Sequence, residues 1–439
     1  MNNSVSQELL KFLQKSPTAF HAVQQMKSEL LAVDFTELKE NQRWNIECGK
    51  HYLVTRNDSS LIAFTIPENG IDKMHILTSH SDSPTFKIKE NPEIEVEKHY
   101  VKLNVEKYGG MLCAPWFDRP LSVAGRVIIK DKTNGQFTSK LVNIDRDLVM
   151  IPNLAIHMNR EINSGYNYNA QKDLLPLYGC GSPKGTFMEQ IAEAAGVEKD
   201  EILGHDLFLY NRQEGSIWGA SKEFISSGRL DDLQCAFASL QGFLSGEKRD
   251  CMAVHCVLDN EEVGSGTKQG AASTFLFDTL IRVHEALGYD GEDYRVHLAD
   301  SFMISADNAH AVHPNHPEKT DVQNCVYMNE GVVIKSHAGQ KYTSDAVSIA
   351  IFKGLCEKAN VPVQFFSNRS DVLGGSTLGN IAMAQVSMNS VDIGLPQLAM
   401  HSSYETAGIK DTYYMIQVME EFFNSHIEKI SSNEFKVIK

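Results

Sequence analysis

Side chains able to bind a metal ion recur at points where predicted strands or loops end. His80 and Asp82 follow the strand 74–78, and Glu261 and Glu262 follow the strand 252–258. The other members of this set are Asp231 and Asp232 after Arg229-Leu230, Asp307 after the strand 302–305, and His401 in a late loop. Imidazole and carboxylate ligands without thiolate suit Zn²⁺, Co²⁺ or Mn²⁺ and do not suit Ca²⁺.

Such a set can hold a pair of divalent ions, provided that one carboxylate bridges them. Five ligands then give each ion three protein contacts and leave open positions for water and substrate. A further carboxylate must act as general base and take a proton from the attacking water. The adjacent Glu261 and Glu262 offer one ligand and one base. Asp82 is placed to accept the second N–H of the His80 ring and to fix its orientation.

The elements that position these residues are those of an α/β fold interrupted by a β-rich stretch. Hydrophobic spacing predicts helices over 9–13, 20–31, 233–243, 274–287, 344–357 and 413–430, and strands over 61–64, 74–78, 252–258 and 302–305. Ser16-Pro17 predicts the cap and first turn of the second helix. Ligands bind at the carboxyl ends of strands in open α/β sheets, which is where the candidate residues fall.

Between these two α/β segments the chain changes character. From residue 85 to about 156 strands alternate, and Asn134-Gly135 predicts a type I′ hairpin turn. A short helix over 188–195, closed by Gly196, is expected to follow. We therefore predict one catalytic domain built from residues 1–84 and 217–439, with residues 85–216 as an inserted β-rich domain.

The composition indicates a soluble cytoplasmic enzyme. The 439 residues carry 41 basic and 56 acidic side chains, a net charge of −15, which argues against binding to nucleic acid or to an anionic membrane. No apolar run approaches the roughly 20 residues of a membrane span, and no secretory signal is visible at the start. The eight cysteines are scattered without a CxxC pair, as expected of free thiols in a reducing compartment.

Several segments together resemble the M18 family of metallo-aminopeptidases, of the aspartyl aminopeptidase type. They occur in the family's order along nearly the whole chain. The segments are HSDSPTFKIK (80–89), GGMLCAPWFDRPLSVAGRV (109–127), IPNLAIHMNREIN (151–163), SSGRLDDL (226–233), LDNEEVGSGTKQGA (258–271), ISADNAHAVHPNHPEK (304–319), QKYTSDAV (340–347) and MHSSYETAG (400–408). The resemblance implies an α/β zinc-peptidase domain interrupted by a β-rich dimerisation domain.

The resemblance also implies a role for each candidate residue. The ligands of one ion are then His80, Asp231 and Asp307. Those of the other ion are Asp231, Glu262 and His401, with Asp231 as the bridge. Glu261 takes the position of the general base, and Asp82 that of the carboxylate behind His80. A cis peptide bond between Asp231 and Asp232 is expected by similarity to related dinuclear zinc peptidases.

Lys341 and Tyr342 match a substrate-binding segment of the family. His310 is expected to be a substrate-pocket or structural residue, because the five ligands already complete both metal sites. Gly375 lies in a loop whose backbone is expected close to the substrate. Assembly is implied by the resemblance as well. Family members form dimers and then a tetrahedral dodecamer, in which the insertion of one subunit lends a histidine to its neighbour's site. His157 matches that histidine.

The predicted activity is that of a dinuclear metallo-aminopeptidase (EC 3.4.11.-) that removes the N-terminal residue from peptides. The local cations predict a preference for acidic N-terminal residues. Two alternatives remain open from the sequence. One is a metal-dependent deacylase of N-acyl amino acids, which would need no free amine. The other is a catalytically silent assembly protein, whose signature would be the loss of a ligand or of Glu261.

Overall fold

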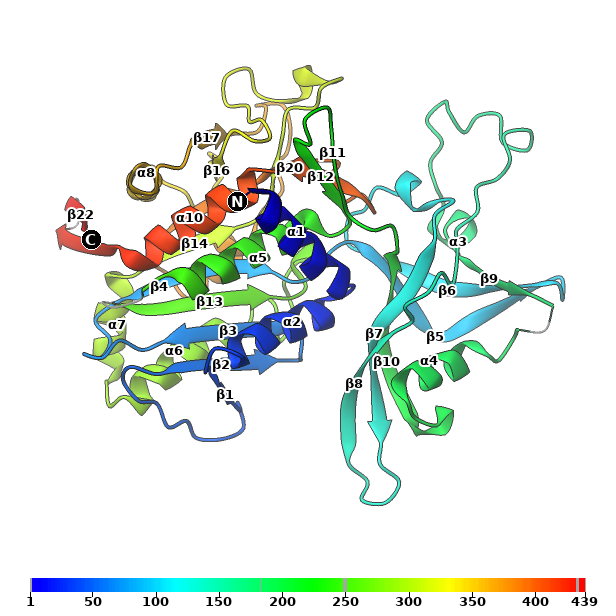
Figure 1. Cartoon of the computed structure of the whole chain (residues 1–439), viewed down its shortest axis with the longest axis horizontal. Helices are drawn as coiled ribbons and strands as arrows, with labels where there is room; N and C mark the ends of the chain where they lie inside the picture. Colours follow the sequence, from blue (N-terminus) through cyan, green and yellow to red (C-terminus); the bar gives the residue numbers. More distant parts are fainter. Residues whose placement is uncertain (1, 182, 248–250, 432–433, 439) are drawn as a thin grey trace.

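The protein consists of an α/β unit and a β-rich unit that lies beside it (Figure 1). The computed structural model describes residues 2–181, 183–247, 251–431 and 434–438. The α/β unit takes its elements from both ends of the chain, and the β-rich unit takes its six-stranded sheet from the middle. The predicted fold class, an α/β catalytic domain with an inserted β-rich domain, is confirmed.

A nine-stranded sheet forms the centre of the α/β unit. Its strands, in spatial order, are β1 (Thr36–Leu38), β2 (His51–Arg56), β3 (Ser60–Thr65), β13 (Met252–Leu258), β4 (Met74–His80), β14 (Phe302–Ala306), β18 (Asn389–Gly394), β16 (Val332–Lys335) and β17 (Val363–Phe366). The central strand β4 pairs in parallel with both β13 and β14. All residues of these three strands are buried, as expected of parallel strands covered on both faces.

Helices cover both faces of this sheet and make three layers. One face is covered by α1 (Asn2–Lys15), α2 (Ala19–Leu31), α5 (Leu230–Ser245), α8 (Ala346–Ala359) and α10 (Asp411–Asn424). The other face is covered by α6 (Phe275–Ala286), α7 (Gly291–Ala299) and α9 (Leu378–Ala382). Alternate residues of β4 enter the two cores: Leu77 packs in the first, and Met74 and Ile76 pack in the second.

The β-rich unit is built on a six-stranded antiparallel sheet. In spatial order its strands are β8 (Phe137–Asn143), β7 (Leu121–Lys130), β10 (Ile202–Asn211), β5 (Thr85–Val96), β6 (Tyr100–Tyr108) and β9 (Leu177–Cys180). Helix α4 (Phe187–Ala195) packs on it through Phe187 and Ile191, and the short α3 (Ala170–Asp173) lies nearby. In Figure 1 the end of the β7–β8 hairpin extends beyond the rest of the β-rich unit.

Two smaller sheets complete the fold. A five-stranded sheet joins β11 (Ser216–Trp218), β12 (Phe224–Ser227), β20 (Glu405–Gly408), β19 (Pro396–Leu398) and β15 (Ala309–His310). The C-terminal hairpin pairs β21 (His426–Ser431) with β22 (Glu434–Ile438). Within the described ranges, no helix is long and apolar enough to cross a membrane.

Most predicted elements are present, and three local predictions are wrong. The second helix is capped by Thr18 rather than Ser16, although Thr18 makes no side-chain capping bond. The Asn134-Gly135 hairpin forms, but its loop spans 131–136 and Asn134 lacks the positive φ of a type I′ turn. The last helix ends at Asn424, because the chain becomes extended at Ser425 and then pairs as a strand.

Candidate metal centre

The candidate ligands meet at the carboxyl ends of the three adjacent parallel strands. His80 is the last residue of β4, and Asp307 comes one residue after β14. Glu261 and Glu262 form the short turn η3 (Glu261–Val263) that follows β13. The parallel pairing places these strand ends side by side, which explains why residues more than 200 positions apart converge.

Two further segments close the cluster from outside the central sheet. Asp231 and Asp232 lie at the start of α5, joined by a cis peptide bond as expected. His401 lies in the loop between β19 and β20. Arg229, Asn260 and His401 have φ near +63° to +66°, a region that non-glycine residues occupy only where surrounding contacts fix the backbone.

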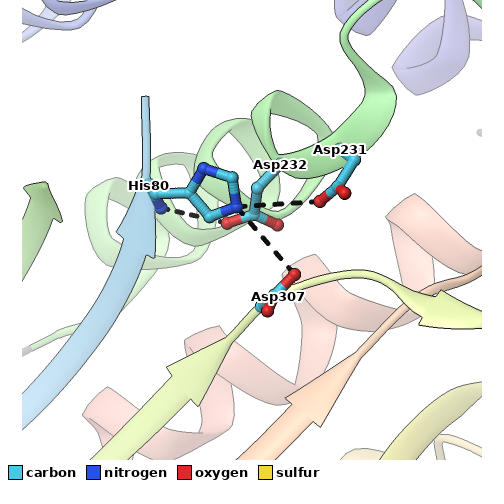
Figure 2. Close-up of side chains that lie close together, drawn as sticks. All are labelled: His80, Asp231, Asp232 and Asp307. Carbon is cyan, nitrogen blue, oxygen red and sulfur yellow. Dashed lines mark hydrogen bonds and ion pairs between the residues drawn. The ribbon is translucent and has the colours of Figure 1, made fainter. Parts of the chain in front are cut away.

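Distances within the cluster define two groups that share Asp231. In Figure 2, dashed lines join the ring of His80 to Asp231 and to Asp307, with Nε2–Oδ1 distances of 3.7 and 3.9 Å. In the second group, Nε2 of His401 lies 3.2 Å from Oδ2 of Asp231 and 3.4 Å from Oε1 of Glu262. Each oxygen of Asp231 therefore faces a different histidine, which is the arrangement that a bridging ligand needs.

Asp232 also belongs to the first group. One of its oxygens, Oδ2, accepts the backbone N–H of His80 at 3.0 Å. The pKa values of the two adjacent carboxyls move in opposite directions. Burial raises the pKa of Asp232 well above its usual range, and Asp307 and Asp231 add to this. Burial acts the same way on Asp231, but His401 and His80 outweigh it and hold its pKa well below the ordinary value. Without a bound cation, Asp231 is therefore the ionised member of the pair.

The residues present fit a divalent metal. Among the described residues, three buried carboxylate oxygens have no hydrogen-bond partner: Asp231 Oδ1, Asp232 Oδ1 and Glu262 Oε1. Burying anionic oxygens without partners is costly, and a cation at this position would satisfy them. Within the described ranges, groups with ligand atoms within 4.8 Å of one another are His80/Asp231/Asp232/Asp307, Asp231/Glu262/His401 and His80/Glu261/Glu262.

A set of hydrogen bonds behind the ligands fixes their orientation. Nδ1 of His80 lies 3.2 Å from the backbone oxygen of Asp82 and 3.3 Å from its Oδ1. The carboxylate of Asp82 also accepts the backbone N–H groups of Glu261 and Glu262, at 3.1 and 3.2 Å. One buried side chain therefore links the ends of β4 and β13, as supporting carboxylates do in metal sites.

Two residues near the cluster have no role in the sequence-based prediction. Glu405 accepts the backbone N–H of Asp231 at 3.0 Å and that of His401 at 2.8 Å. Lys335 is buried at the end of β16, with Nζ 3.5 Å from Oδ2 of Asp307. The sequence does contain a signal for Lys335, because a lysine that ends an apolar strand such as Val332–Lys335 is expected to be buried. Glu405 lies inside a recognised motif, but its contacts cannot be read from spacing.

The predicted substrate residues are less well gathered. Tyr342 is buried, and its ring centroid lies 5.3 Å from Nζ of Lys335. Lys341 is exposed, so the cation that contacts the cluster is Lys335 instead. His310 is exposed by its accessible surface, with its ring 6.1 Å from that of Phe366, but it lies close to the cluster. Burial, Lys335 and His401 lower its pKa, and Asp231 opposes them. Gly375 is exposed on a loop, and an added Cβ there would meet no described atom within 4 Å.

His157 lies in the inserted unit and does not contact the cluster of its own chain. It is exposed, and among the described residues no hydrogen bond or ion pair connects it to the candidate ligands. Its assignment therefore stays a prediction.

The parallel strand ends of this sheet bring histidines and carboxylates together, and several of the carboxylate oxygens have no hydrogen-bond partner in the described chain. This arrangement is that of a metal-dependent enzyme. The sequence model of the family described as "Aminopeptidase I zinc metalloprotease (M18)" matches residues 12–423. A protein of Clostridium novyi named "Probable M18 family aminopeptidase 2" is 49% identical over 432 residues, covering 97% of this chain and 100% of the relative. The chain belongs to the M18 family of metallo-aminopeptidases.

Solved structures agree with this assignment. The structure described as the "Ape4 and Nbr1 complex" aligns with a TM-score of 0.93 and 35% identity, covering 96% of this chain and 86% of that one. The structure described as the "S. cerevesiae mApe1 dodecamer" aligns with a TM-score of 0.83 and 27% identity, covering 95% and 96%.

Proposed function

We propose that the protein is a dinuclear aminopeptidase that hydrolyses the N-terminal peptide bond of peptides. The observation that carries this proposal is the position of Asp231, whose two oxygens face His80 and His401 from the two ligand groups. We assign His80, Asp231 and Asp307 to one ion, and Asp231, Glu262 and His401 to the other. Zn²⁺ is the proposed metal, and Co²⁺ or Mn²⁺ suits the same ligands.

In the proposed reaction, Glu261 is the general base. Two divalent ions bound here would supply Lewis acidity toward the scissile carbonyl and lower the pKa of water. Without bound cations, burial, reinforced by Asp307 and Asp82 against the opposing effect of His80, raises the pKa of Glu261 to about 7. Divalent ions beside it would lower this pKa, so that Glu261 is ionised and able to take a proton from the attacking water and return it to the leaving amine. Asp82 holds the backbone of Glu261 while it does so.

We further propose a preference for N-terminal Asp or Glu over apolar residues, with Lys and Arg cleaved slowest. Lys335 supports this proposal, because it is a buried cation that lies against the cluster and over the Tyr342 ring. An opposite charge is attracted more strongly in a buried site than in bulk water.

The proposed assembly is a homo-oligomer in which dimers form a tetrahedral dodecamer, and one solved relative is described as a dodecamer. Three apolar side chains around His157 support a partner that covers this segment. Leu154, Ile156 and Met158 are 54%, 49% and 74% exposed. Apolar side chains grouped on a surface mark an interaction site. We propose that the inserted domain spans residues 85–216, that it carries the dimer contact, and that His157 reaches the site of the neighbouring subunit in the cytoplasmic oligomer.

A substrate panel tests the activity. The metal-depleted protein is reloaded with Zn²⁺, Co²⁺ or Mn²⁺ and assayed on aminoacyl chromogenic substrates and on their N-acetylated forms. We expect cleavage of the free amines only, with Asp and Glu fastest. Cleavage of the acetylated forms would favour a deacylase, and fastest cleavage of Lys or Arg would refute the charge preference.

Mixing of two inactive variants tests the shared site. A His157→Gln subunit keeps Glu261, and a Glu261→Gln subunit keeps His157. If His157 acts on the neighbour, dissociation and joint reassembly will restore activity, because some sites then combine both intact residues. Each variant reassembled alone is the control. No recovery in verified mixed oligomers would show that the site is not shared.

A further inference from the structure

A cavity of about 300 Å³ lies between the two units, on the side of the cluster where the supporting carboxylates stand. Both passages of the chain between the units line it: 83–85 on the way into the insertion and 209–211 on the way out. Asp82 and Glu405 also line it, whereas the described lining includes none of the five proposed ligands. This cavity is therefore distinct from the reaction site. Asp82 and Glu405 lie between the two, because they line the cavity and also contact the segments that carry the ligands.

Arg229 lines this cavity with a guanidinium that has no anionic partner. Its Nη2 donates to the backbone oxygen of Leu13 at 2.9 Å. Its Nε is buried and lacks a hydrogen-bond partner, and no carboxylate of the described chain lies within ion-pair distance of it. A guanidinium withdrawn from bulk water is costly unless it is paired, and its planar fork of donors matches a carboxylate.

The acidic groups of the cavity are already engaged elsewhere. Asp206 is paired with Lys87 and with Arg126, each at 3.0 Å. Asp82 accepts the N–H groups behind the metal ligands, and both oxygens of Glu405 accept N–H groups of Asp231 and His401. Asp259, the fourth acid of the lining, accepts the backbone N–H of Asn260 at 2.7 Å. Glu405 acts on the charge of Arg229 from a distance, but none of the four acids forms an ion pair with it. The aromatic rings of Phe20, Trp116, Phe208 and Tyr210 supply apolar wall beside it.

We propose that this interdomain cavity binds a small carboxylate that carries an apolar or aromatic group, with the carboxylate on Arg229 and the apolar part against the aromatic wall. Asp82 and Glu405 line the same cavity, so the occupant lies beside groups that orient the proposed ligands. This site is separate from that of the peptidase reaction and does not depend on it.

Calorimetric titration of the zinc-loaded protein with 3-phenylpropionate tests the proposal. An excess of an amino-acid hydroxamate occupies the metals during the titration, so that the probe cannot bind there. We expect saturable binding of 3-phenylpropionate and at least tenfold weaker binding of the neutral amide, 3-phenylpropionamide. The readout needs no turnover, so its failure is distinguishable from failure of the proposed activity.

Two variants locate the binding. Arg229→Met should weaken it at least tenfold, and Ala19→Trp should abolish it by filling the cavity from the first turn of α2 while Arg229 is kept. Arg295→Met, which changes an exposed arginine on α7, is the matched control and should bind like the wild type. The proposal is overturned if the wild type does not bind 3-phenylpropionate, if the amide binds as tightly, or if folded Ala19→Trp protein binds undiminished.

Discussion

Tyr108 of the inserted sheet donates a hydrogen bond of 2.7 Å to Asp82, which supports His80 at the end of β4. The hydroxyl of Tyr108 in turn accepts a hydrogen bond of 2.8 Å from Nδ2 of Asn260. Burial and the charge of Asp82 raise the pKa of Tyr108, so that it remains a protonated donor. The inserted unit therefore takes part in orienting the candidate metal centre of its own chain.

Replacing Tyr108 with phenylalanine should weaken metal binding. The change removes one donor to Asp82 and leaves a buried carboxylate oxygen less well satisfied, while the ring keeps its packing. Loss of a group that supports a metal ligand costs about 10–100-fold in metal affinity or activity. Zinc affinity measured by competition with a chelator checks this. Tyr178→Phe, which removes a hydroxyl elsewhere in the same unit, should leave the affinity unchanged.

Glu261→Gln should retain metal and lose at least about 100-fold in kcat. An amide cannot take a proton from water, and general acid–base groups contribute roughly 10²–10⁴-fold. Metal analysis of the purified variant, together with kcat on the best substrate, checks both parts. Glu262→Gln is the matched comparison, because it should lower metal content as well. Turnover above about one hundredth of the wild-type value would remove Glu261 from the role of base.

Removal of metal should lower the temperature of thermal unfolding by roughly 5–10 °C. Without a cation, the buried oxygens of Asp231, Asp232 and Glu262 lose their proposed partner. A ligand at about a thousand times its Kd stabilises the folded state by about 4 kcal/mol. At roughly 2 cal/mol/K of unfolding entropy per residue, each kcal/mol corresponds to roughly 1.5–2 °C in a unit of about 300 residues. Chelated and zinc-restored samples are compared by calorimetry. Equal unfolding temperatures would contradict a metal site in this cluster.

His255→Leu should flatten the dependence of stability on pH. The side chain is fully buried against Phe243, and its two ring nitrogens have no hydrogen-bond partner among the described residues. Burial lowers the pKa of His255 from 6.5 to about 3. The unfolded chain therefore binds a proton between these pH values when the folded chain does not. The contribution of neutral His255 to the free energy of unfolding is therefore fully present above pH 6.5. It is lost progressively as the pH falls toward 3.

The size of this effect follows from the slope of about 1.4 kcal/mol per pH unit for one proton. Between pH 6.5 and 5 the wild type should lose about 2 kcal/mol of unfolding free energy that the leucine variant keeps. Unfolding at several pH values checks this difference. His99→Leu alters an exposed histidine and should behave as the wild type does. A parallel loss in the His255 variant would show that this ring does not titrate as described.

The sequence predicts the metal ligands better than it predicts the residues that contact and orient them, because local pattern reports strand ends and does not report long-range contacts. His80 and Glu262 each follow an apolar run that must be a buried strand, so local pattern places them at a sheet edge. Glu405 contacts Asp231 across 174 positions, and no periodicity reports such a contact. Lys335 ends an apolar strand and is buried, whereas Lys341 lies in a polar loop and is exposed, and only the packed structure shows which of the two contacts the cluster. The same applies to residues 426–430, where pairing with β22 overrides the helical pattern.

The pairing of β4 with β13 has a consequence for how the chain is made. These neighbouring strands are separated in the sequence by the entire six-stranded sheet of residues 85–211. A chain that leaves the ribosome from its N-terminus exposes all of that sheet before residues 252–258 appear. Folding of the insertion then brings 85 and 211 together and shortens the loop that the catalytic sheet must close. The insertion thus acts first as an internal folding aid for the domain that contains it.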